Sequence, residues 1–303
     1  MTQSMTFGET LSNQARRINN GELTSLLSPW QLLTNYTKAF IPGKMMVLCG
    51  DPGSGKSFML MQMAIMWYEQ NIPFAIYELE DDIETYLNRA LGQLTATAGF
   101  ADMDWIKDNY DTVCRAHSDY AEFIEAFGAS ITLSPEYIPT FQGMRAWVQE
   151  QCDAGKRVIC IDPITNVIAS TKKKFEEESE FVGWLNFVCR KYEVTIILNH
   201  HPKNQAGGNA VPCLSALAGS ASFSRFGHTV IWLEPHEMKN SQITTWAGTS
   251  EDEHNRTVHL LKTRNGCGQG RRIAFVFNHH TLMLEEKGLI VKKKKNKGGD
   301  DGE

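Results

Sequence analysis

The sequence predicts an α/β domain with a mainly parallel sheet that is flanked by helices and extended by an antiparallel C-terminal edge. Short apolar runs alternate with longer helical segments between residues 45 and 198, which is typical of a parallel sheet. A glycine-rich loop joins the first apolar run to a helix. Four strand-like segments with glycines between them follow residue 228, and this pattern favours hairpins at the sheet edge.

The length and charge of the chain limit the alternatives. The 303 residues are 42% hydrophobic, enough for one large α/β domain or two smaller ones. Because the net charge is −5, nucleic-acid binding must come from local basic patches. We find no signal peptide and no apolar run as long as a membrane span, so we expect a cytoplasmic protein, in the host cytoplasm if viral, without a membrane partner. The seven cysteines form no C-x-x-C pair, and we interpret them as reduced thiols.

The termini differ in composition from the rest of the chain. We predict a flexible N-terminal segment over residues 1–28, a nucleotide-binding domain over 29–288 and a disordered charged tail over 289–303. Leucines between residues 21 and 40 indicate a short helix, which can lie on its own domain or on a neighbouring subunit.

The first strand, residues 45–49, leads into a complete G-x-x-x-x-G-K-S phosphate-binding loop. Backbone N–H groups of such a loop bind phosphate oxygens, and the following helix adds its positive dipole end. Lys56 can reach the β- and γ-phosphates, and the Ser57 hydroxyl can hold Mg²⁺. We therefore predict binding of ATP and Mg²⁺, with nucleotide contacts from Gly50, Asp51, Pro52, Gly53, Ser54, Gly55, Lys56, Ser57 and Phe58.

The chain then alternates between strands and helices. We predict strands at residues 73–77, 129–133, 156–162 and 194–198, and a long helical region over residues 83–128. Further helices are predicted at residues 141–152 and 179–191, with polar loops at 166–178 and 200–215. The C-terminal strands are predicted at residues 229–233, 257–262, 271–277 and 281–284.

Two carboxylates at strand ends complete a hydrolytic site. Asp162 ends a β-branched strand, which places it beside the nucleotide loop as a Mg²⁺-side aspartate, unless it is only a helix cap at the end of the strand. Glu80 follows the neighbouring strand and is our candidate for the base that activates water. The competing acids in the same turn are Glu78, Asp81 and Asp82, any of which can be a solvated charge.

Asn199 and His200 end the next strand at the same edge of the sheet. A polar side chain there can contact the γ-phosphate, and simple capping of the strand end is the alternative. The neighbouring histidines lack the spacing and the cysteine partners of a zinc site, so we predict no zinc.

Lys262 and Arg264 alternate along the last part of a strand, so their side chains share one face. In an oligomer, the anion between them can be the γ-phosphate bound by the next subunit. A solvated edge strand protected by charge is the alternative.

Lysines occur in both polar loops that leave this edge of the sheet. They can bind the phosphates of nucleic acid, or they can be solvated charges, since three glutamates follow the first group. The predicted DNA-binding residues are Lys172, Lys173, Lys174 and Lys203.

Taken together, these motifs resemble the RecA-like ATPases of hexameric replicative helicases of the DnaB/RepA type. The similar segments are GDPGSGKS, residues 74–93 with Glu80 and Arg89, VICIDP, LNHHPK, residues 214–233 and KTRNG. The resemblance implies a RecA-like P-loop NTPase fold and a ring, usually a hexamer. It also implies ATP at subunit interfaces, with Lys262 and Arg264 reaching the neighbour's site, and Arg89 near the nucleotide. His200 stands where the DnaB type usually has glutamine.

The function that we expect is an ATP-dependent helicase or translocase on single-stranded DNA in replication, with replication proteins as further partners. A recombinase-like filament ATPase is an alternative that is compatible with the IDPIT stretch at residues 161–165. A non-motor ATPase that acts as a loader or switch is another. The long helical region at residues 83–128 favours the helicase.

Overall fold

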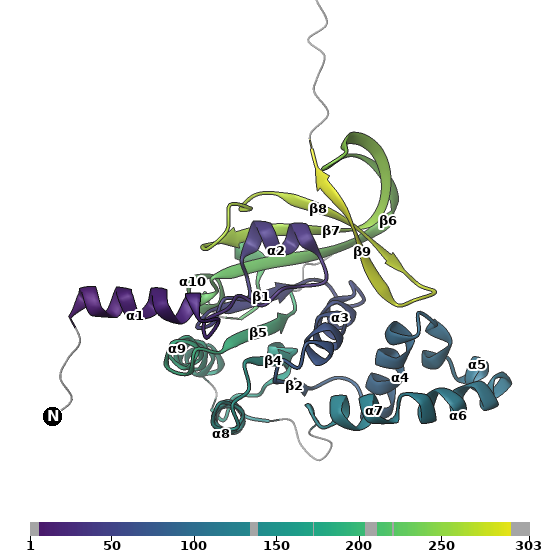
Figure 1. The fold of residues 1–303 in the computed structure, drawn as a ribbon, viewed down its shortest axis with the longest axis horizontal. Helices are drawn as coiled ribbons and strands as arrows, with labels where there is room; N and C mark the ends of the chain where they lie inside the picture. Colours follow the sequence, from purple (N-terminus) through teal and green to yellow (C-terminus); the bar gives the residue numbers. More distant parts are fainter. Residues whose placement is uncertain (1–5, 134–138, 172, 204–210, 220, 292–303) are drawn as a thin grey trace, which may run out of the picture.

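A computed structural model describes residues 6–133, 139–171, 173–203, 211–219 and 221–291. A nine-stranded sheet runs through it in the order β3-β2-β4-β5-β1-β6-β7-β8-β9 (Figure 1). The strands are β1 (Met45–Cys49), β2 (Phe74–Glu78), β3 (Ile131–Leu133), β4 (Val158–Asp162), β5 (Thr195–His200), β6 (Thr229–Thr245), β7 (Gly248–Thr263), β8 (Arg272–Asn278) and β9 (Met283–Ile290).

The sheet has a parallel half and an antiparallel half. Strands β1 to β5 pair in parallel, and β6 adds to β1 in the same direction. From β6 onward each strand is antiparallel to the previous one, and β6 also pairs with β9, so the last four strands curl and close. This arrangement confirms the predicted fold class.

Helices cover both faces of the parallel half because side chains of its buried strands alternate between two apolar clusters. One cluster packs against α3, α4 and α7, and the other against α8, α9 and α10. The helices are α1 (Phe7–Asn19), α2 (Gln31–Thr37), α3 (Lys56–Glu69), α4 (Ile83–Leu94), α5 (Met103–Asp108), α6 (Tyr110–Asp119), α7 (Ala121–Gly128), α8 (Phe141–Asp153), α9 (Lys174–Tyr192) and α10 (Ser222–Phe226), with 3-10 turns η1 (Ala98–Ala101), η2 (Ile164–Asn166) and η3 (Leu214–Ala216).

The N-terminal region contains helices that the sequence analysis left open or missed. Within the predicted flexible segment, α1 has no buried residue and projects beside the sheet (Figure 1), where Arg17 pairs with Glu193. Helix α2 lies on its own domain, because Leu33 is buried and Trp30 donates to the Leu284 carbonyl over 2.8 Å.

Three predicted boundaries need correction. Helix α9 begins at Lys174, so the loop predicted over residues 166–178 is shorter. Strand β9 continues to Ile290, past the expected domain boundary at residue 288. Strands β6 and β7 form one long hairpin in place of two short strands. None of the helices in the described ranges is long and apolar enough to cross a membrane.

Candidate nucleotide site

The phosphate-binding loop connects β1 to α3, as predicted. Gly53 and Gly55 have φ angles of 72° and 103°, which an L side chain rarely adopts, so glycine suits both positions. Lys56 donates to the carbonyl oxygens of Gly50 (2.9 Å) and Asp51 (3.1 Å) across the loop. Burial lowers the pKa of Lys56, and the nearby Asp162 carboxylate opposes that shift.

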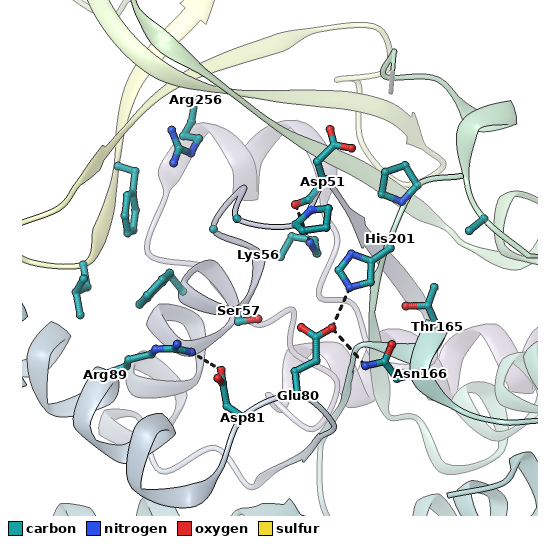
Figure 2. Close-up of a pocket in the computed structure, with 18 of the residues that line it drawn as sticks. Asp51, Lys56, Ser57, Glu80, Asp81, Arg89, Thr165, Asn166, His201 and Arg256 are labelled. Carbon is teal, nitrogen blue, oxygen red and sulfur yellow. Dashed lines mark hydrogen bonds and ion pairs between the residues drawn. The ribbon is translucent and has the colours of Figure 1, made fainter. Parts of the chain in front are cut away.

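A cavity of about 1090 Å³ opens over this loop. A cavity of this size is large enough for a nucleotide. It draws on the loop, the turn after β2, helix α4, the segments after β4 and β5, strands β7 and β8, and the turn between β8 and β9 (Figure 2). Its lining includes Asp51, Pro52, Gly53, Gly55, Lys56, Ser57, Phe58, Glu80, Asp81, Arg89, Thr165, Asn166, His201, Pro202, Lys203, Arg256, Phe277, His279 and Leu282.

Asp162 ends β4 next to the loop, in a setting that fits a divalent cation. Burial raises its pKa, while the neighbouring polar side chains of Asn199 and Ser57 and the charge of Lys56 counteract the shift. Its Oδ2 atom is buried without a hydrogen-bond partner among the described residues. A buried carboxylate oxygen beside a serine hydroxyl is a donor set that Mg²⁺ accepts.

Glu78 lies in register with Asp162 on the neighbouring strand. Burial, together with the Asp162 carboxylate, raises the pKa of Glu78 to about 8. Its Oε1 accepts hydrogen bonds from the backbone N–H groups of Glu80 (2.8 Å) and Asp81 (3.1 Å). The sequence analysis treated Glu78 only as a competitor of Glu80. In the structure, Glu78 is buried beneath the turn that carries Glu80 and binds its backbone.

Glu80 points into the cavity from the turn after β2 (Figure 2). Its Oε1 lies 3.2 Å from His201 Nε2 and 3.3 Å from Asn166 Nδ2. The hydrogen bond from His201 lowers the pKa of Glu80, with Asn166 and the charge of Lys56 acting in the same direction. Glu80 is therefore an ionised carboxylate facing the phosphate-binding loop, where a base for water is required.

The adjacent histidines His200 and His201 face opposite sides of the sheet, and the one that faces the nucleotide side is not the one predicted from the sequence. His200 is fully buried against Phe223 on the other face of the sheet, and burial lowers its pKa to about 3. Because side chains alternate along a strand, Asn199 and His201 face the nucleotide side instead. The structure thus places His201, and not His200, in the cavity, while Asn199 lies beneath it beside Asp162.

The far end of the cavity combines aromatic rings with arginines. Arg89 pairs with Asp81 and lies over the Phe58 ring, 5.5 Å from its centroid. Arg256 donates from Nε to the Ser54 carbonyl (2.8 Å) and lies 5.4 Å from the centroid of another ring, Phe277. The sequence analysis missed Arg256 and Phe277, since both lie on antiparallel strands without a motif.

Lys262 and Arg264 lie at the opposite edge of the sheet from this cavity. The Arg264 N–H donates to the His228 carbonyl (2.9 Å), and the His228 N–H donates to the carbonyl of Met45, the first residue of β1. Both cationic side chains donate to the Arg225 carbonyl, Lys262 over 3.2 Å and Arg264 over 3.0 Å. Burial, then the charge of Arg264, lowers the pKa of Lys262 to about 8.

The predicted DNA-binding lysines are scattered. Lys173 is exposed and pairs with Glu176 (3.0 Å), and Lys174 is the exposed first residue of α9. Lys203 lines the nucleotide cavity and donates to the Ser215 carbonyl (2.8 Å). Lys172 lies outside the described residues.

Comparison with known proteins places this geometry in a family. Residues 24–207, more than half of the chain, match the family model of the AAA domain. A solved structure described as an ATPase domain is similar with a TM-score of 0.71 at 15% identity, covering 93% of this chain and 99% of that one. A DnaB-like replicative helicase, described with its interactions with primase, matches with a TM-score of 0.67 at 15% identity, covering 93% and 67%. Curated protein sequences give no match. The chain therefore belongs to the AAA domain family and has the RecA-like fold of a DnaB-like helicase ATPase domain.

Proposed function

We propose that the chain is a cytoplasmic ATP-dependent motor that acts on single-stranded DNA in replication, as a helicase or translocase, and hydrolyses ATP between subunits of a ring. The observation that carries this proposal is that Lys56 and Glu80 line one cavity, while the buried Asp162 carboxylate lies beside Lys56. Phosphate binding, cation binding and water activation are the three parts that hydrolysis of a nucleoside triphosphate requires.

In this proposal each group has one task. Lys56 leaves the loop carbonyls and binds the β- and γ-phosphates. Ser57 and Asp162 hold Mg²⁺, which supplies positive charge to the phosphate oxygens. Glu80 accepts a proton from the attacking water, since its lowered pKa keeps it ionised at neutral pH. The adenine base of ATP stacks at the aromatic end of the cavity, beside Phe277 and Arg256.

The position of Lys262 and Arg264 supports hydrolysis between subunits. Neither side chain reaches the cavity of its own chain, because Arg264 lies at the amino end of β1 and the phosphate-binding loop at its carboxyl end. A head-to-tail contact between copies brings such an edge to the neighbour's cavity, and repeated contacts of this kind close into rings. The similarity to DnaB-like helicases supports single-stranded DNA as the polymer and further replication proteins as partners.

The test is steady-state ATP hydrolysis with and without single-stranded DNA, beside a sizing measurement with Mg²⁺ and nucleotide. We expect strong stimulation by DNA and a ring-sized particle. Glu80→Gln should bind ATP normally and turn it over at least about 100-fold more slowly, the scale of a lost general base. Turnover by a monomer that ignores DNA would contradict the motor and favour a nucleotide switch. An open filament on DNA would favour a recombinase-like protein.

A further inference from the structure

The backbone of the turn that carries Glu80 is hydrogen-bonded to a buried carboxyl group. Glu78 Oε1 accepts the backbone N–H groups of Glu80 (2.8 Å) and Asp81 (3.1 Å). The N–H of Leu79 donates to the Asp162 carbonyl (2.8 Å). All three amides after β2 therefore have partners, and two of them depend on one side-chain atom.

The carboxylate of Glu80 accepts a hydrogen bond from the side chain of Asn166. Asn166 Nδ2 donates to Glu80 Oε1 over 3.3 Å, and Asn166 ends the 3-10 turn η2. The chain beyond it is firmly anchored, because Val167 is fully buried and Ile168 pairs with Thr140 in a β-bridge. A donor on such a fixed segment can define the direction of the flexible Glu80 side chain.

His201 donates to the same oxygen of Glu80 from Nε2 (3.2 Å). It also lies next to an anchor, since Pro202 forms a β-bridge with Leu217. Two donors on Oε1 leave Oε2 as the oxygen that can accept a proton from water. Figure 2 shows the Glu80 carboxylate directed at both donors.

We propose that Glu78 and Asn166 are positioning residues for hydrolysis: Glu78 fixes the backbone of the turn that carries Glu80, and Asn166 fixes its carboxylate. The inference rests on the proposed function, in which Glu80 is the base. A base must be within hydrogen-bond reach of the water, and a displacement of 1 Å in a reacting group can cost about 100-fold in rate. Neither residue needs to touch the nucleotide to control the rate.

A pair of substitutions at Glu78 tests the backbone role. Glu78→Gln keeps a carbonyl oxygen at Oε1 and should retain kcat within about three-fold, because a neutral acceptor can still satisfy both amides. Glu78→Ala removes the acceptor and should lower kcat at least about ten-fold with little change in KM for ATP. Equal kcat for Glu78→Ala and wild type contradicts the proposal, and so does an equal loss in both variants.

Asn166→Ala tests the carboxylate role on a residue outside the core. We expect kcat to fall about ten-fold and KM to stay within about two-fold, since only the direction of the base changes. Asn240→Ala is the matched control, because Asn240 is an exposed asparagine on the β6–β7 hairpin. A rise in kcat for Asn166→Ala would mean that Asn166 restrains the base, and would overturn the proposal.

A double-mutant cycle with Glu80→Gln separates positioning from a general structural role. If Asn166 acts through Glu80, Asn166→Ala added to Glu80→Gln should change the residual kcat by less than about two-fold, because groups that act as a unit are not additive. A further ten-fold loss would contradict the inference and leave the proposed function intact. Normal turnover by Glu80→Gln itself would instead refute the assigned base, and with it both proposals.

Discussion

The parallel and antiparallel halves of the sheet serve the same site in different ways. Strands β1, β2, β4 and β5 are short and fully buried, and the segment that follows each of them lines the cavity. Strands β6 and β7 are 17 and 16 residues long and reach both edges of the sheet. In the parallel half, a residue contributes to the site because it lies at the end of a strand. In the antiparallel half, its position along the strand determines which site it can reach.

Strand β7 makes the difference concrete. Arg256 contacts the phosphate-binding loop, and Lys262 follows six residues later, roughly 20 Å along an extended strand. Groups that far apart cannot share one triphosphate. One strand of the antiparallel half therefore serves its own cavity at one position and, in our proposal, the neighbour's at another.

The largest expected effect comes from Arg264→Ala. If Arg264 completes the neighbour's site, kcat should fall about 1,000-fold, the lower end of the range for such arginines, while ATP binding remains. Arg225→Ala is a useful control, because its backbone carbonyl, which accepts from Arg264, is retained. Kinetics and equilibrium ATP binding check this prediction. An unchanged kcat for Arg264→Ala would contradict it and would favour the alternative that this edge of the sheet is a solvated surface.

A smaller effect is expected from Phe277→Leu at the cavity end of the antiparallel half. The change keeps an apolar side chain but removes the ring beside Arg256, so ATP should bind about ten-fold more weakly, as for the loss of one stacked base. Phe277→Tyr keeps the ring and should bind ATP like wild type. Titration with a fluorescent ATP analogue measures both affinities. Equal affinities in the two variants would contradict the proposal that the Phe277 ring stacks on the adenine base.

The smallest effect concerns stability. His254 on β7 is fully buried, and burial lowers its pKa from 6.5 to about 4. Below pH 6.5 the unfolded chain therefore binds a proton that the folded chain does not, so the free energy of unfolding falls as the pH drops from 6.5 toward 4. His254 contributes at most about 1.4 kcal/mol per pH unit to this slope.

The variant His254→Phe should remove that contribution. His200 and His228 also have lowered pKa values and act in the same direction, but they are present in both proteins. His236, whose ring centroid lies 4.8 Å from that of His254, also has a lowered pKa, so the comparison of urea unfolding at pH 6.5 and pH 5 reports on the contacting pair His236 and His254. Parallel pH dependences of wild type and variant would contradict this account.

The two halves also differ in how much the sequence reveals. In the parallel half, continuous apolar runs predicted the strands closely, and the phosphate-binding loop predicted their direction toward one edge. In the antiparallel half, the outer parts of β6 and β7 are polar and exposed, so they carry no hydrophobic pattern that could indicate strands. Backbone pairing supplies most of their contacts, with the buried Ile243 and a hydrogen bond between Thr244 and Thr249 as additions, and backbone pairing has no sequence signature.

Within the site, residue types were easier to predict than orientations. The strand that leads into the two histidines was predicted, but successive side chains there alternate between faces, so His201 lines the cavity in place of His200. Counting alternation from Asn199 could have found this. Asn166 carries no such signal, because its contact with Glu80 depends on how two separate loops approach each other.

The most direct test of the central claim, that one chain supplies the two ends of different sites, is to mix two inactive variants. Glu80→Gln lacks the base but keeps Arg264, and Arg264→Ala has the reverse defect. In a ring assembled at random from equal amounts, one interface in four combines an intact base with an intact arginine, so roughly a quarter of wild-type ATP hydrolysis should return. Energy transfer between labelled subunits verifies that the variants mix. Mixed rings that stay inactive would contradict hydrolysis between subunits.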